Sequence, residues 1–170
     1  MSIQEKIASE ESMQIVIFRL GEDYLSCPIS QVREIIQLEE VTPVPSTPKE
    51  IRGIINRRGE IITIVDLPEV IDTELKLKET NSQLLILYSE DENVGVMTSE
   101  VTEIPTVDTN SIEPPSETME TPINKEYLEG IIKREDRLVL FIDLLALMKN
   151  LSQQDIDRAA KFGQSDEKQG

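Results

Sequence analysis

An internal repeat constrains the fold of this chain more than any other feature. Residues 51–67 (IRGIINRRGEIITIVDL) align without a gap on residues 128–144 (LEGIIKREDRLVLFIDL), 77 positions further along the chain. Residues 15–35 align in the same way on residues 84–104, 69 positions further along. Two ungapped matches in the same order are hard to obtain by chance, so we interpret the chain as a duplicated unit. The identical pairs are Gly53/Gly130, Ile54/Ile131, Ile55/Ile132, Arg57/Arg134, Asp66/Asp143, Leu67/Leu144, Ile17/Ile86, Ser30/Ser99, Val32/Val101, Glu34/Glu103 and Ile35/Ile104.

Short apolar runs rich in Ile and Val, separated by turn residues, predict strands rather than helices. Residues 32–36 fit either a strand or the end of a helix. A short C-terminal helix is expected to begin at Ser152 and end near Lys161. The runs that predict strands are residues 13–20, 24–28, 53–56, 61–67, 84–88, 94–97, 131–132 and 138–142.

Each half of the repeat is too small for a robust core of its own. A unit of about 70 residues is marginal as an independent domain, so the two halves should share a core or exchange strands. We therefore expect a mainly β fold of two intertwined small barrels related by a pseudo-twofold axis, with short helices. We expect a single domain over residues 13–150, with repeat halves at about 13–71 and 82–148. The termini, residues 1–12 and 163–170, are expected to be flexible.

Composition excludes several classes of function. The net charge of −16 opposes binding to nucleic acid or to anionic membrane surfaces. No apolar run approaches the ~20 residues of a membrane helix, and the N-terminus lacks the apolar core of a signal peptide. Cys27 is the only cysteine, which fits a reducing, cytoplasmic compartment and excludes an intrachain disulfide. The chain has no histidine, which excludes histidine-based nucleophilic catalysis and histidine metal sites. It also lacks a glycine-rich phosphate loop, so we expect no cofactor and no metal.

Two aspartates at equivalent repeat positions, Asp66 and Asp143, raise the alternative of an aspartic-protease dyad. Each aspartate ends an apolar strand and precedes a helix-like stretch, where aspartate is a natural N-cap. Glu69 follows Asp66 by three residues, as in a capping box. We favour the capping interpretation and predict no enzymatic activity.

A basic turn stands out on an acidic chain. Asn56 and Gly59 flank two arginines between two apolar strands, and both residues tolerate the left-handed backbone of tight hairpins. Residues 49–62 hold four basic and two acidic residues, whereas residues 85–130 hold one basic and eleven acidic residues. The repeat places Glu135 where the first half has Arg58. Divergence at an exposed tip of a shared scaffold indicates a docking residue at Arg58.

The order of these motifs resembles CheW-type chemotaxis coupling proteins. The hallmark segment is residues 53–59 (GIINRRG) followed by residues 64–67 (IVDL). Further matching segments occur in the family's order and extend the resemblance over residues 13 to 148. They are residues 13–20, 24–36, 43–45 (PVP), 95–101 and 126–130 (EYLEG).

The resemblance implies a pair of intertwined five-stranded, SH3-like barrels. It also implies a non-enzymatic adaptor that couples the cytoplasmic tip of a chemoreceptor, a methyl-accepting chemotaxis protein, to the regulatory domain of the CheA histidine kinase. Such an adaptor is expected to be a monomer outside the signalling array. The partner-binding positions that the resemblance carries over are Val32, Glu34, Gly53, Asn56 and Arg58. The remaining alternative is a generic β-barrel interaction module in another two-component signalling pathway.

Overall fold

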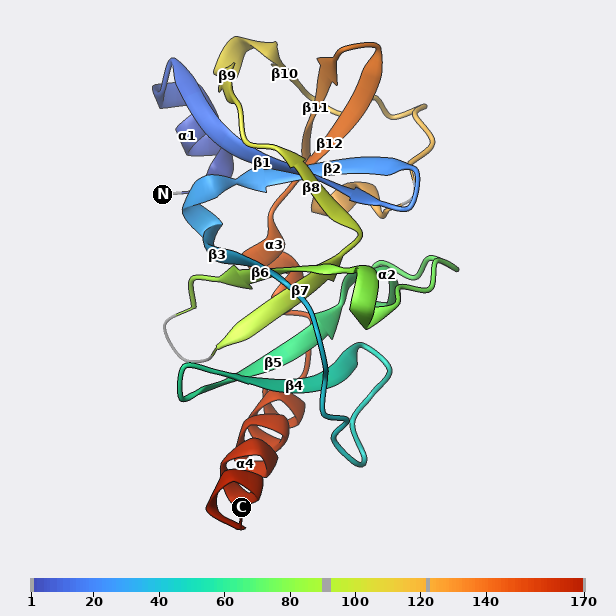
Figure 1. Cartoon of the computed structure of the whole chain (residues 1–170). Helices are drawn as coiled ribbons and strands as arrows, with labels where there is room; N and C mark the ends of the chain where they lie inside the picture. The colour runs from blue at the N-terminus through green and yellow to red at the C-terminus, as the bar shows by residue number, and fades with distance from the viewer. Residues whose placement is uncertain (1, 90–92, 122, 170) are drawn as a thin grey trace.

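Two β-sheets, each containing strands from both repeats, form the body of the protein (Figure 1). The computed structural model describes residues 2–89, 93–121 and 123–169, with the side chains of the last helix as far as Ser165. Its strands are β1 (Ser12–Leu20), β2 (Asp23–Pro28), β3 (Val32–Gln37), β4 (Ile51–Arg57), β5 (Glu60–Asp66), β6 (Gln83–Leu87), β7 (Val94–Thr98), β8 (Glu100–Glu103), β9 (Thr106–Asp108), β10 (Ile112–Glu113), β11 (Leu128–Arg134) and β12 (Arg137–Ile142). Its α-helices are α1 (Ile3–Ser9), α2 (Leu67–Val70), α3 (Leu144–Met148) and α4 (Gln153–Gln169).

The order of strands shows that the repeats exchange hairpins. One sheet has the order β3-β6-β7-β5-β4, and the other has the order β10-β11-β12-β2-β1-β8, with β9 also paired to β1. In the repeat, β6 and β7 correspond to β1 and β2. The five-stranded sheet therefore combines the β6–β7 hairpin with three strands of the first half, and the seven-stranded sheet combines the β1–β2 hairpin with five strands of the second half. The predicted intertwined, mainly β architecture is therefore confirmed. The segment at residues 32–36, left open by the sequence, is strand β3.

The expected five strands occur in one sheet, whereas the other sheet has seven. The two additional strands are β9 and β10, which lie within the proline-rich stretch that makes the second half longer. β9 pairs with the beginning of β1, and β10 pairs with β11. These strands have three and two residues, too short to give a periodic apolar pattern in the sequence.

Equivalent strand pairs in the two sheets have the same register and the same irregularities. The ladder between β3 and β6 contains a bulge, and the equivalent ladder between β8 and β1 contains the same bulge. The ladders between β4 and β5 and between β11 and β12 are likewise irregular at Gly53 and Gly130. The equivalent partners across the first bulge are Val32↔Leu87 with Val101↔Phe18, and Glu34↔Ile86 with Glu103↔Ile17.

Ion pairs join the two edges of each repeat unit. β3 and β4 are the outer strands of the five-stranded sheet, yet the guanidinium of Arg57 contacts the carboxylate of Glu34. The equivalent pair joins β11 to β8, with Arg134 Nε 2.7 Å from Glu103 Oε1. Each sheet is therefore curled strongly enough for these strands to approach one another, as in an open barrel.

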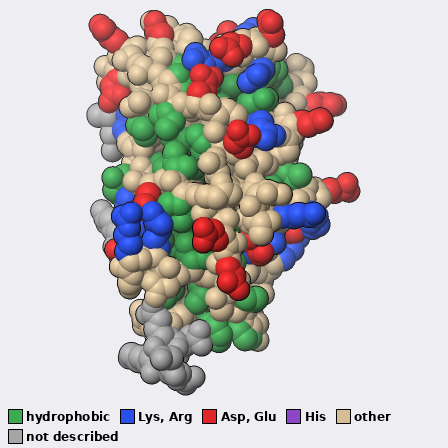
Figure 2. Space-filling view, in the orientation of Figure 1, with side chains coloured by type: hydrophobic (Ala, Val, Ile, Leu, Met, Phe, Trp, Pro, Cys, Tyr) green, Lys and Arg blue, Asp and Glu red, His purple; other side chains and the backbone are tan. Residues whose placement is uncertain are grey.

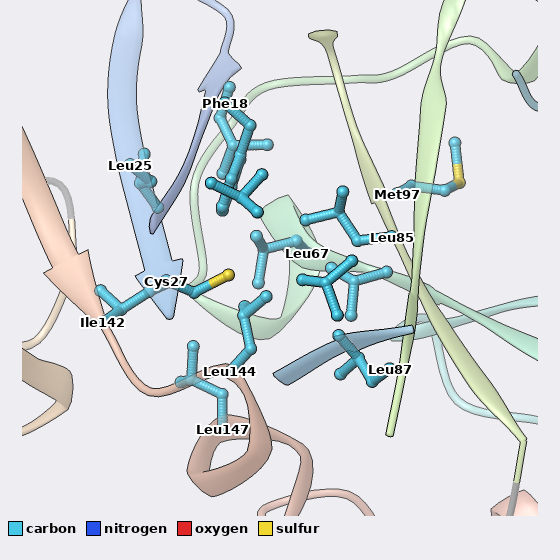
Figure 3. Packing of buried hydrophobic residues seen from close by; sticks show 14 of the residues in the cluster. Phe18, Leu25, Cys27, Leu67, Leu85, Leu87, Met97, Ile142, Leu144 and Leu147 are labelled. Atoms are coloured by element: carbon cyan, nitrogen blue, oxygen red, sulfur yellow. The ribbon is translucent and has the colours of Figure 1, made fainter. Parts of the chain in front are cut away.

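The largest apolar core draws on both halves of the chain. Phe18, Leu25 and Cys27 of the first half pack with Ile142 and Leu144 of the second, and all five are fully buried. Figure 3 shows these side chains converging from separate strands and helices on one centre. Because neither half encloses this cluster alone, its burial depends on both halves being folded.

Helices cover the two outer ends of the structure: α1 lies within residues 1–12, and α4 begins at Gln153, as expected for the C-terminal helix, and continues beyond Lys161. In α1, Ser2 caps the first turn and Ile3 is buried in the core of the seven-stranded sheet. At the other end, α4 packs on β4 and β5 through Ile156, Ala159 and Phe162, and its backbone is helical to Gln169. The apolar residues of each helix are few but fall on one face, so packing on a sheet stabilises both α4, which the sequence predicted, and α1, which it did not predict.

The two repeat-related aspartates are helix N-caps. Asp66 Oδ1 accepts a hydrogen bond from the backbone N–H of Glu69 at 3.3 Å, at the start of α2. Asp143 Oδ1 accepts one from the backbone N–H of Ala146 at 3.0 Å, at the start of α3. Asp66 also pairs with Arg52 at 2.7 Å, and Asp143 accepts a hydrogen bond from Gln31. Both carboxylates therefore have structural partners, as the capping interpretation predicts.

Close approach of a neighbouring segment explains the glycines at Gly53 and Gly130. A Cβ on Gly53 would lie 2.3 Å from the backbone oxygen of Thr42, and the residue has a φ of +153°. A Cβ on Gly130 would lie 2.5 Å from a methyl group of Ile112 and 3.1 Å from the backbone oxygen of Glu113. In each repeat a crossing segment pairs here, so the glycines permit the same local packing.

We predict that Gly53→Ala destabilises the protein more than the matched variant Gly130→Ala. The first new methyl meets a backbone carbonyl and an unfavourable φ, whereas the second meets mainly a side chain that can move. Costs of about 1–3 kcal/mol are typical of such strain. Urea unfolding of both variants measures the difference, and equal or negligible losses would contradict the packing described here.

Candidate partner-binding site

A two-residue turn presents Arg58 at the tip of the β4–β5 hairpin. Arg57 and Glu60 are the last paired residues, and Arg58 and Gly59 between them have φ values of +54° and +84°. Positive φ at both central positions is the type I′ geometry that fits the twist of a hairpin. Asn56 Oδ1 accepts a hydrogen bond from the backbone N–H of Gly59 at 3.1 Å and so fastens the turn.

The two neighbouring arginines have different surroundings. Arg57 Nε donates to Glu34 Oε1 at 3.1 Å, and a second guanidinium nitrogen of Arg57 contacts the same oxygen. The side chain of Arg58 is 78% exposed, and its guanidinium lies 4.0 Å from Glu34 Oε1. Arg57 therefore fixes the hairpin against β3, whereas Arg58 is available for a charge-assisted hydrogen bond to a partner.

The electrostatics of this cluster follow from the ion pair. The hydrogen bond from Arg57 lowers the pKa of Glu34 below its ordinary value of 4.5, and the charge of Arg58 acts in the same direction. The hydrogen bond from Arg134 lowers the pKa of Glu103 in the same way. Both carboxylates therefore remain ionised at neutral pH and keep their arginines in place.

An open groove of about 360 Å³ adjoins the basic turn. One wall is β4 with Asn56, Arg57 and Arg58, and the other is the end of β3 with the segment that follows it, including Glu39 and Glu40. The groove has basic groups on one side and exposed acidic groups on the other. Such an arrangement suits a polar protein surface and selects its orientation through charge.

The structure brings together three of the five predicted site residues at the surface. Glu34, Asn56 and Arg58 lie around the basic turn. Val32 is 8% exposed and pairs with β6, and Gly53 is buried beneath Thr42. These two residues lie on the strands that carry Glu34 and Arg58, so they shape the site through the backbone rather than through their own contact surface.

The role of Arg57 was not predicted from the sequence. The signal was available in the repeat, because Glu34/Glu103 and Arg57/Arg134 are two identical pairs of opposite charge. Their pairing across each sheet unit was not deduced, since it depends on the curl of the sheet. The second hairpin tip has Glu135 and Asp136 in place of Arg58 and Gly59, so the same scaffold carries an acidic tip there.

Three further features were considered for a functional role: the cysteine, clusters of possible metal ligands and long apolar helices. Cys27 is fully buried, and burial raises the pKa of its thiol, which keeps the group protonated as a packing residue. Within the part of the chain that the structure describes, no cluster of acidic, cysteine or histidine side chains is arranged to hold a metal ion. Within the same residues, no helix is both long enough and apolar enough to span a bilayer.

The fold and the site together define a duplicated β protein with exchanged hairpins and an exposed, charged turn. The model of the CheW-like domain family matches residues 14–152. The chain therefore belongs to the CheW-like domain family of chemotaxis scaffold proteins.

The similarity to known relatives extends over most of the length of each protein. The chain is 27% identical to the chemotaxis protein CheW of Treponema pallidum, over 84% of this chain and 85% of that protein. It is also 27% identical to the chemotaxis protein CheW of Klebsiella aerogenes, over 92% and 94%. The crystal structure of the scaffolding protein TtCheW from Thermoanaerobacter tengcongensis superposes with a TM-score of 0.71 at 34% identity, covering 80% of this chain and 87% of that one.

We predict that replacing Glu34 by Gln reduces the loss of stability in acid. A carboxyl with a depressed folded-state pKa stabilises the protein above its unfolded pKa, and this contribution is lost as the pH falls through the folded-state value. The wild type should therefore lose thermal stability more steeply than Glu34→Gln between about pH 6 and about pH 3. Glu103→Gln is the matched variant and should behave alike. If the melting temperatures of the wild type and both variants fell equally with pH, the ion pairs would contribute nothing to the pH dependence of stability.

Proposed function

We propose that this chain is a cytoplasmic, non-enzymatic adaptor that couples chemoreceptor tips to the CheA histidine kinase in signalling arrays. The observation that carries the proposal is the match to the CheW-like domain over residues 14–152, combined with an exposed basic turn at the predicted docking position. A coupling protein needs two interfaces on a rigid body and no chemistry of its own. The shared core supplies the rigidity, because neither half can move without disturbing the other.

The surface supports this proposal. Figure 2 shows apolar side chains gathered along the middle of one face, between the two sheets, with charged side chains around them. An apolar centre with a polar rim is the usual composition of a protein interface. The tip of a chemoreceptor is a helical hairpin, and helices bind such surfaces through an apolar face.

In this proposal Arg58 supplies a charged contact to a partner, Asn56 shapes the turn, and Glu34 holds the neighbouring arginine. Val32 and Gly53 set the positions of the strands. Outside the array the protein would be a monomer.

We predict that Arg58→Asn weakens binding to the receptor tip or to the kinase regulatory domain without unfolding the protein. Asparagine tolerates the positive φ of the turn, so this variant removes the charge and retains the local geometry. Truncation at an interface centre costs roughly 2 kcal/mol, about thirtyfold in affinity, whereas an exposed turn residue changes stability by only about 0.5 kcal/mol. Arg58→Glu should weaken binding further through like-charge repulsion. Calorimetric titration and thermal melting separate the two effects.

Glu135→Ala provides the internal control, because Glu135 occupies the equivalent tip of the second hairpin. It should have a milder effect on the same partner. If Arg58→Glu binds both partners with unchanged affinity at moderate salt, the basic turn is only a solvated hairpin. Failure of the wild type to bind either partner would favour a β-barrel interaction module of another two-component pathway.

We also expect the purified protein to hydrolyse neither ATP nor peptides, with or without divalent metal. Asp66 and Asp143 are engaged as helix caps, so neither is presented to a substrate. Turnover assays at high protein concentration provide the measurement. Reproducible turnover that Asp66→Asn abolishes, in a variant that remains folded, would overturn the assignment.

A further inference from the structure

The bulged residue of β3 reaches the hairpin that carries Arg58. In the ladder between β3 and β6, two residues of β3 are accommodated against one of β6, and Arg33 is the extra residue. Arg33 Nη2 lies 3.0 Å from Glu60 Oε2, and Arg33 Nη1 donates a hydrogen bond to Asn93 Oδ1 at 3.5 Å. Bulges commonly redirect a side chain out of its regular position. This bulge brings a guanidinium to the base of the β4–β5 turn.

Arg33 and Glu34 together hold both strands of the hairpin next to its tip. Arg57 and Glu60 lie directly opposite each other at the end of the β4–β5 ladder. Glu34 contacts the guanidinium of Arg57, and Arg33 contacts the carboxylate of Glu60. Two consecutive residues of β3 therefore form two ion pairs of opposite polarity, one with each strand of the hairpin. The four side chains carry two positive and two negative charges and neutralise one another.

The second repeat keeps one of these two ion pairs, between Glu103 and Arg134. Its bulged residue is Thr102, whose hydroxyl donates a hydrogen bond to the backbone oxygen of Ile17 on the neighbouring strand β1 at 3.3 Å. Threonine has no charge, so this bulge cannot form an ion pair with its hairpin. The equivalent bulge is therefore bound to its own sheet.

The hairpin of the second repeat also differs at the position of Glu60. Arg137 occupies this position, and its guanidinium carbon lies 4.5 Å from the centre of the Tyr24 ring, in a cation–π contact. The ion pair of Arg33 with Glu60 thus has no counterpart in the second repeat, where the shared frame forms without it. The duplicated fold does not require this pair, and the repeat that has it is the one whose tip carries Arg58.

We propose that Arg33 and Glu60 are positioning residues of the docking site, which fix the β4–β5 tip and the direction in which Arg58 meets a partner. Their side chains are 31% and 52% exposed, and an ion pair at such a surface contributes little to global stability. Because the two ion pairs neutralise themselves, Arg58 is the cation left over, and the partner group that it meets is acidic. The statement about a partner rests on the proposed function, whereas the order of the tip does not.

Glu60→Gln separates a positioning role from a simple charge effect. If Glu60 acted only through its charge, its removal would strengthen the binding of an acidic partner group at Arg58, because a nearby negative charge would be lost. If Glu60 positions the tip, the same change weakens binding. We expect the affinity for the receptor tip or the kinase regulatory domain to fall about fivefold in calorimetric titration. The melting temperature should change by about 2 °C or less.

Glu100→Gln is the matched control for loss of a surface ion pair. Glu100 pairs with Arg19 at 2.8 Å, and the two side chains are 56% and 33% exposed, but the pair lies in the other sheet. This variant should bind as the wild type does. The double variant Arg33→Glu with Glu60→Arg keeps the net charge and restores an ion pair of reversed polarity. It should recover part of the affinity that either reversal alone removes.

Amide relaxation of the free, ¹⁵N-labelled full chain measures the order of the tip without any partner. The order parameters of Arg58 and Gly59 should lie near about 0.85 in the wild type and fall towards about 0.6 in Glu60→Gln. In Glu100→Gln they should equal those of the wild type. A pair that served only the general stability of the sheet would leave the tip as ordered as before.

Two results would overturn the proposal. The first is equal order at the tip in the wild type and Glu60→Gln. The second is binding by Glu60→Gln that is unchanged or tighter with a partner that the wild type binds. If the wild type binds neither partner, the adaptor function fails, while the order parameters still decide whether Arg33 and Glu60 fix the tip.

Discussion

The structure depends on the exchange of hairpins between the two repeats. Each exchanged hairpin is held on both sides by strands of the other half: β7 pairs with β5 in parallel and β6 with β3 antiparallel, while β2 pairs with β12 in parallel and β1 with β8 antiparallel. Without these pairings each half would have an incomplete sheet and an exposed apolar face, which a unit of about 70 residues cannot offset. Exchange completes both sheets at once and brings side chains of both halves into one core. The protein is therefore expected to fold as a single cooperative unit, although its sequence is that of two small ones.

The two repeats share most of their local structure, so the positions at which they differ can be identified. The bulges, the capping aspartates, the glycines beneath crossing segments and the ion pairs of Arg57 and Arg134 occur in both repeats. They are what the duplicated fold requires. The hairpin tips and the segments after α2 and α3 differ between the repeats. Glu135 stands at the repeat position of Arg58, and Lys149 stands at the repeat position of Asp72. Since the scaffold does not dictate these positions, they are where two similar halves can acquire different partners.

Much of the fold could be predicted because it rests on short-range patterns. Apolar runs, turn residues and the ungapped repeat predicted the strands, their duplication and the caps at Asp66 and Asp143. Features that depend on distant contacts escaped. β9 and β10 exist because β1 and β11 offer edges for pairing, and α1 is stabilised by the sheet that it covers, whereas the C-terminal helix α4 was predicted. The site was predicted in part for the same reason: the turn at Arg58 is local, whereas the contact between Glu34 and Arg57 arises from the curl of a whole sheet.

That contact changes how Glu34 is understood. From the sequence alone, Glu34 and Arg58 were two independent partner-binding positions. In the structure one carboxylate faces two guanidinium groups, and Arg57 makes the hydrogen bonds while Arg58 remains 4.0 Å away. Glu34 therefore offsets the charge of Arg57 and reduces the repulsion between adjacent arginines, which leaves Arg58 extended from the tip. In the proposed docking site, Glu34 would act on a partner through Arg58, and Gly53 would act through the path of β4. The proposed site is thus one exposed cation, Arg58, held in place by a buried glycine, a turn fastened by the Asn56 amide and an internal ion pair.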